Sequence, residues 1–186
     1  MIQQKGVCAY TEHLLYPNIQ EVEEKINQLL LEKEDYPKRI GYFGSIDHYI
    51  SNLKKERGWD IQNLFLIHSD LNRDKGIKET LNELNPANPN YSPRYYFYYS
   101  LSDHKFYPLR TLEHDLKESV RTQLDDVLGI NSPAIVSLRK AYFRRIETDI
   151  KLLGKTIEHF IAVEHNQFFT AFEMCKQDLL DMPLIN

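Results

Sequence analysis

Histidine and carboxylate side chains recur in this sequence at the points where short apolar segments end. His68 and Asp70 directly follow the most apolar segment. Asp103 and His104 follow a tyrosine-rich segment, and His13 comes shortly after the first one. Imidazole and carboxylate groups act as general acids and bases, and both bind divalent metal ions. We therefore predict catalytic roles for His68, Asp70, Asp103 and His104. The same chemistry makes His13, His68 and Asp70 the predicted metal ligands.

Gly44-Ser45 is a second feature that could bind a ligand. We predict a turn at these two residues, followed by a helix that carries His48. Backbone amides at the start of a helix can bind a phosphate group. Gly44, Ser45 and His48 are therefore the predicted residues for binding a cofactor or an anion. The alternative is that Ser45 only caps the helix.

The predicted catalytic residues meet only if the segments before them are neighbouring strands of one sheet. Four apolar segments have the length and composition of strands: residues 5–10, 39–43, 61–67 and 94–101. Segments with helical spacing lie between them, with predicted starts at Asn18, Ser45 and Asp74. Strands joined by helices are typically parallel, and the C-terminal ends of parallel strands lie at one edge of the sheet. We therefore predict an α/β fold over residues 1–108, with a small, mostly parallel sheet of about four strands and crossover helices.

The sequence after the predicted sheet has apolar residues at helical spacing alone. One predicted helix ends at Gly129. The next begins at Ser132-Pro133, because serine is a good helix cap and proline suits the first helical position. A single helix from there to the end would be longer than a domain of this size is wide. We therefore expect a break near Gly154 or Asn166, or a partner chain that covers the excess. Residues 109–186 are thus a predicted C-terminal helical extension, packed on the first region within one structural domain.

The composition limits the classes of protein to which the chain can belong. It has 186 residues, 42% of them hydrophobic, and a formal net charge of −4. A chain of this size can bury a core of its own, and its acidic balance disfavours binding along a nucleic-acid backbone. No apolar run approaches the roughly 20 residues of a membrane span. Cys8 and Cys175 lie far apart, which favours a reducing cytoplasm, although one buried bridge between them stays open.

These observations lead to two hypotheses about function. The first is a cytoplasmic domain that binds a small polar molecule bearing a phosphate group at the shared sheet edge. In that case a phosphate ester hydrolase, assisted by a divalent metal ion, fits the residue types best. This hypothesis requires that the four histidines after the predicted strands approach one another: His13, His48, His68 and His104. The alternative is a non-catalytic module that forms a homo-oligomer through its C-terminal helices.

Overall fold

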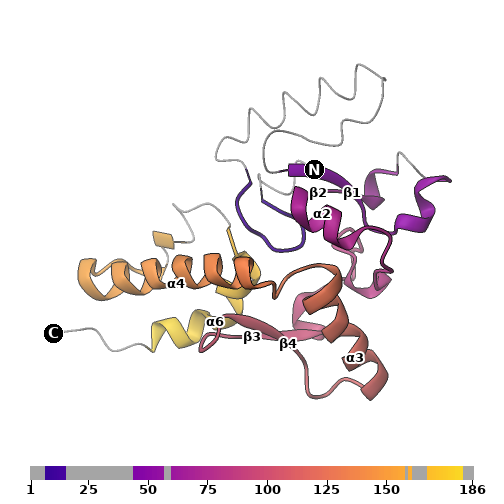
Figure 1. Cartoon of the computed structure of the whole chain (residues 1–186). Helices are drawn as coiled ribbons and strands as arrows, with labels where there is room; N and C mark the ends of the chain where they lie inside the picture. Colours follow the sequence, from indigo (N-terminus) through magenta and orange to yellow (C-terminus); the bar gives the residue numbers. More distant parts are fainter. Residues whose placement is uncertain (1–6, 16–43, 57–59, 158, 161–166, 182–186) are drawn as a thin grey trace.

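The computed structural model describes residues 7–15, 44–56, 60–157, 159–160 and 167–181, and it contains two separate antiparallel hairpins (Figure 1). The strands are β1 (Gly44–His48), β2 (Leu64–His68), β3 (Phe97–Ser100) and β4 (Lys105–Pro108). The helices are α2 (Ser69–Lys75), α3 (His114–Thr122), the π-helix η6 (Gln123–Val127), α4 (Pro133–Leu153) and α6 (Phe169–Leu180). Short 3-10 turns are η2 (Ser51–Lys54), η3 (Ile61–Asn63), η4 (Asn82–Leu84) and η5 (Pro93–Tyr95).

The predicted parallel sheet is wrong, because β1 and β2 pair antiparallel, with Gly44 opposite His68 and His48 opposite Leu64. The predicted turn and helix at Gly44-Ser45 are also wrong, since these residues begin β1. Polar residues in β1 made this strand hard to recognise from sequence, yet four of its five positions are buried. The helix α2 allows this burial because its side chains bond to those polar groups, as Asn72 does to the Ser45 hydroxyl.

The other predicted elements of the first region fare unevenly. The strand predicted at 61–67 is confirmed from Leu64 onward as β2, whose first four residues are buried, while its first three residues form η3. The strand predicted at 94–101 is confirmed in its second half as β3, after the turn η5. The helix predicted to start at Asp74 is wrong, since α2 ends one residue later and Gly76 follows with a φ of 54°. The strand at 39–43 and the helix from Asn18 lie outside the described residues.

The predicted helical boundaries of the C-terminal region agree with the structure. The chain leaves η6 just before Gly129, and α4 begins at Pro133 with Ser132 in the capping position. The long helix ends at Gly154 in the left-handed conformation, which confirms a break there. One hydrophobic core cluster contains side chains of both predicted regions, from Cys8 to Leu179. The boundary at residue 108 stays a prediction. None of the helices in the described ranges is long and apolar enough to cross a membrane.

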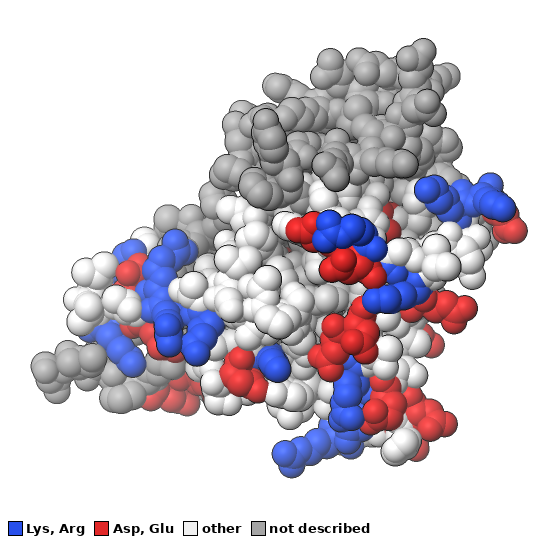
Figure 2. Space-filling view, in the orientation of Figure 1, with Lys and Arg blue, Asp and Glu red and all other residues white. Residues whose placement is uncertain are grey.

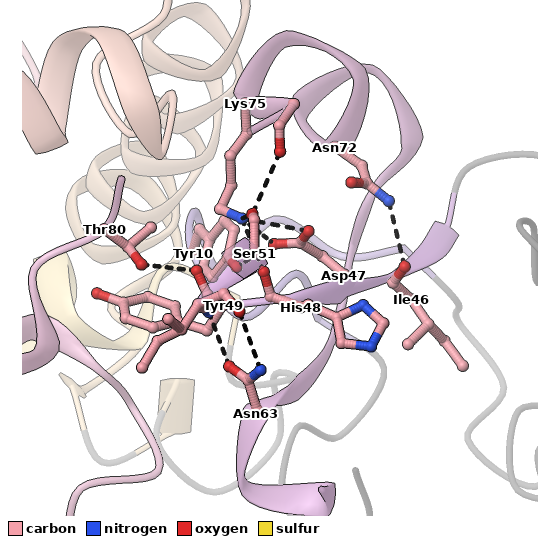
Figure 3. A network of polar contacts seen from close by, with 12 residues as sticks. Tyr10, Ile46, Asp47, His48, Tyr49, Ser51, Asn63, Asn72, Lys75 and Thr80 are labelled. Atoms are coloured by element: carbon pink, nitrogen blue, oxygen red, sulfur yellow. Dashed lines mark hydrogen bonds and ion pairs between the residues drawn. The ribbon is translucent and has the colours of Figure 1, made fainter. Parts of the chain in front are cut away.

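A buried ion pair between Lys75 and Asp47 connects α2 to the first hairpin (Figure 3). Lys75 is 1% exposed, and its ammonium lies 3.0 Å from a carboxylate oxygen of Asp47 in β1. The same nitrogen donates to the carbonyl of His48 at 2.8 Å and to the hydroxyl of Ser51 at 3.1 Å. The hydroxyl of Tyr10 donates a hydrogen bond to the carboxylate of Asp47. Every charge here has a partner, which is what allows it to be buried.

Replacement of Lys75 tests this network. Lys75→Met leaves Asp47 buried without its cation, so we expect a loss of about 3–5 kcal/mol in the free energy of unfolding by urea. Lys55→Met, at an exposed position, is the control and should change it by less than about 0.5 kcal/mol. Equal stability of the two variants would contradict the structural role of the pair.

Gly129 lies where the second half of the molecule contacts α2. Its φ is +63°, and a Cβ atom there would meet Leu71 Cδ2 at 2.4 Å. Gly154 has a similar φ of +62° but nothing within 4 Å of the same position. Both glycines avoid the strain of a left-handed conformation, but only Gly129 also gives Leu71 its space.

These two glycines form a matched pair for mutation. Gly154→Ala should cost about 1 kcal/mol for backbone strain alone. Gly129→Ala should cost about 1–3 kcal/mol more, because the methyl group displaces Leu71. Urea unfolding of both variants gives the difference directly. If the two losses are equal, Leu71 moves aside at no cost and the contact is not tight.

Candidate functional site

Two of the predicted site residues, His13 and His68, lie side by side. Their ring centroids are 6.4 Å apart. His68 ends β2 and caps α2, with its Nδ1 accepting a hydrogen bond of 3.2 Å from the amide of Asp70. A neutral imidazole that accepts through Nδ1 carries its proton on Nε2. The carboxylate of Asp70 lies 3.8 Å from the same Nδ1 and 2.9 Å from the guanidinium of Arg73.

His13 reaches this position through a tight turn of the N-terminal segment beside β2. The amide of Ala9 donates to the carbonyl of Leu66 at 3.0 Å, so the segment adjoins the strand. The chain then reverses, and the amide of Cys8 donates to the carbonyl of His13 at 2.8 Å. Of the strand predicted at 5–10, residues 5 and 6 lie outside the described residues, and residues 7–10 form no strand beyond an isolated bridge of Val7 with Leu14.

Glu12 holds the turn against the start of α6. Its carboxylate accepts a 2.8 Å hydrogen bond from the amide of Thr170 and a 2.5 Å bond from the Thr170 hydroxyl. Its carbonyl accepts from the amide of Phe168 at 3.0 Å. Both Glu12 and Phe168 have positive φ, 56° and 53°, so the backbone is strained at this junction. The ring of Phe168 stacks on His13 with centroids 6.2 Å apart.

Three buried polar atoms near the histidine pair have no hydrogen-bond partner. Five such side-chain atoms occur in the described residues, and three of them are His13 Nδ1, Thr11 Oγ1 and Ser69 Oγ. All three belong to the two segments that carry the pair. An unpaired buried polar group costs about 1–3 kcal/mol, so a concentration of them needs an explanation.

The electrostatic surroundings keep His13 neutral near neutral pH. Burial lowers the pKa of His13, and the neighbouring His68 lowers it further. A neutral imidazole has a lone pair that can accept a proton. His13 therefore has the protonation state of a general base.

The predicted anion-binding residues Gly44, Ser45 and His48 lie in a strand, not at the start of a helix as that prediction required. Gly44 adjoins His68, but as its partner across the hairpin and without a helix start. The hydroxyl of Ser45 accepts from Asn72 at 2.9 Å, and buried His48 lies at the other end of β1. His48 therefore does not join the histidine pair.

Asp103 and His104 belong to a different network in the turn between β3 and β4. The Nδ1 of His104 lies 2.8 Å from the hydroxyl of Tyr99, and burial lowers the pKa of this histidine. Asp103 accepts from the hydroxyl of Tyr107. Fully buried Arg139 donates to the carbonyl of His104 at 2.7 Å. These contacts shape the turn, so of the four histidines only His13 and His68 lie close together. The expected approach of all four histidines is therefore wrong.

The predicted metal ligands gain no support from their arrangement. Across the part of the chain that the structure describes, no group of three or more His, Cys, Asp or Glu side chains is placed to hold a metal ion.

The sequence pointed to His13 as a site residue, but it did not assign a role to Glu12 and Thr170, which position His13. Glu12 and Thr170 are 158 positions apart in the sequence, and no local sequence pattern predicts a hydrogen bond between such distant residues.

Comparison of the chain with known protein families, curated proteins and solved structures gave no match.

The pKa of His13 can be measured directly. We expect its imidazole protons to titrate in an NMR experiment with a midpoint below the ordinary value of about 6.5. His68→Gln should raise the midpoint but leave it below that value, because burial is the larger cause. The unfolded chain binds a proton at His13 more tightly than the folded chain does. The free energy of unfolding should therefore decrease as the pH falls below about 6.5. A midpoint at or above the ordinary value would show that the ring is solvated.

Proposed function

We propose that the chain binds a small phosphate-bearing molecule beside His13 and His68, and that this pair alone, without the other two histidines, takes part in hydrolysis of a phosphate ester, with His13 transferring the proton. The observation that supports this most is the close pair of rings, with the Nδ1 of His13 buried and unpartnered. The unpartnered hydroxyls of Thr11 and Ser69 add two donors of the kind that a phosphate oxygen accepts.

The two histidines suit different roles in such a reaction. Neutral His13 accepts a proton from the attacking water while the water oxygen forms a bond to phosphorus. His68 carries a proton on Nε2 and donates a hydrogen bond from it to a phosphate oxygen. The proton gained by His13 passes to the oxygen of the leaving alcohol as the ester bond breaks, so the products are an alcohol and inorganic phosphate and both rings end neutral. The proposal includes no metal ion.

The contacts of Asp70 fit this assignment. Its amide holds the Nδ1 of His68 as an acceptor, and its carboxylate is shared with Arg73. We therefore assign Asp70 the role of orienting His68. We place the function in the cytoplasm, in keeping with Cys8 and Cys175, both of which are free and buried.

Binding of inorganic phosphate tests the proposal. We expect His13→Gln and His68→Gln each to weaken phosphate binding about 10- to 100-fold in calorimetric titrations, the range for loss of one hydrogen bond to a charged group. His114→Gln, at an exposed residue of α3, is the matched control and should bind as the natural protein does. Unchanged affinity in both site variants, or equal loss in the control, would refute a phosphate site here.

Hydrolysis of p-nitrophenyl phosphate tests the catalytic half separately. The natural protein should release p-nitrophenol, and His13→Gln should lose activity most at high pH, where the neutral base matters. Phosphate binding without any turnover would limit the proposal to a binding site. Thermal denaturation of each variant, expected to stay within about 1 kcal/mol of the natural protein, confirms that the fold is intact.

A further inference from the structure

The outward face of α4 combines exposed apolar side chains with a concentration of basic ones. Leu138 is 41% exposed and Leu152 is 67% exposed, 14 positions further along the same helix. Lys140, Arg144 and Arg145 are exposed between them. Figure 2 shows lysine and arginine atoms gathered over this helix. The opposite face of α4 is already occupied, because residues such as Phe143 and Ile146 are completely buried.

The neighbouring helix α6 has the complementary character. Phe169 at its start is 48% exposed and Leu180 at its end is 52% exposed. Its acidic residues are half-buried Glu173 and exposed Asp178, with exposed Asp181 directly after its end, against one base, half-buried Lys176. Figure 1 shows α4 and α6 running along the same side of the molecule, with their C-terminal ends directed the same way. The surface of these two helices therefore carries an excess of bases on α4 and a smaller excess of acids on α6. Both helices expose large apolar side chains, which are Leu138, Leu152 and Leu153 on α4 and Phe169 and Leu180 on α6.

We propose that this surface is an interface with a second copy of the chain, in which α4 of each protomer contacts α6 of the other. A two-fold axis makes both contacts at once, because the same patch serves both partners. Opposite charges then face each other on each side of the axis. The alternative arrangement, α4 against α4, places the bases of both protomers together and is disfavoured by like-charge repulsion.

Burial of the apolar residues supplies the free energy of association, and the charges determine which helices face each other. Burial of the exposed apolar side chains of α4 and α6 in each protomer removes from water the surface that a monomer leaves uncovered. The exposed charges select which helix meets which, and their attraction is screened by salt. This inference is independent of the phosphate site, since it uses neither His13 nor His68.

Reversing the charge of single residues on α4 and α6 tests whether these two helices face each other in the dimer. Sedimentation velocity of the full chain over a range of concentrations should show a dimer that weakens as salt is raised. Arg144→Glu or Asp178→Lys alone should weaken the dimer about tenfold, because each change acts twice across the axis. The double variant should recover most of the lost affinity, since the reversed charges again attract. A stronger dimer in Arg144→Glu alone would instead indicate α4 against α4 and would overturn the proposal.

The apolar part of the surface has its own test and control. Leu152→Ser should shift the natural dimer toward monomer, with Leu180→Ser as a second variant in case the first unfolds. Ile77→Ser removes a side chain that is 92% exposed and lies outside this surface, so it should leave the dimer unchanged. A strict monomer at every concentration, or a dimer unaffected by the leucine and charge changes, would refute the interface.

Discussion

The carboxylate of Glu12, bonded to the first turn of α6, is the contact on which the arrangement of the two halves depends. Burial raises the pKa of this group, while the two bonds from Thr170 and the nearby Arg139 lower it. A helix start offers unpaired amides and a partial positive charge, which suit a carboxylate. The contact fixes Phe168 over His13, and Phe168 in turn lies 5.4 Å from the guanidinium of Arg139. The contact thereby connects the N-terminal turn to α6 and, through Phe168 and Arg139, to α4.

Arg139 extends this link into the second half of the molecule. Its side chain is fully buried, and burial lowers its pKa to about 10. The guanidinium donates to the carbonyls of His104 and Ile130 and lies 4.9 Å from the ring of Phe106. The proposed phosphate site is therefore joined to the β3–β4 turn through one aromatic ring and one cation. The proposed dimer surface uses the outer sides of α4 and α6, the two helices that supply Arg139 and Thr170.

Local signals in the sequence were enough to predict some elements and too weak for others. The apolar run of β2, the start of α4 at Pro133 and its end at Gly154 each follow from neighbouring residues alone. The strand β1 was not predictable, because its buried Asp47 is acceptable only with Lys75 beside it. His13 and His68 were expected to share a site through a parallel sheet, but they meet because the N-terminal turn lies beside β2. Such long-range partners leave no periodic trace in the sequence.

The buried Asp47 has a further consequence for the behaviour of the strand that carries it. In the described part of the chain, β1 pairs with β2 only, and on its other side the carbonyls of Ile46 and His48 accept hydrogen bonds from Asn72 and Lys75 of α2. Unpaired strand edges invite pairing with other molecules and lead to aggregation. Here the side chains of α2 already occupy two of the backbone acceptors that a foreign strand would need. Lys75 thus has two roles, since it neutralises buried Asp47 and also covers an acceptor at the edge of β1.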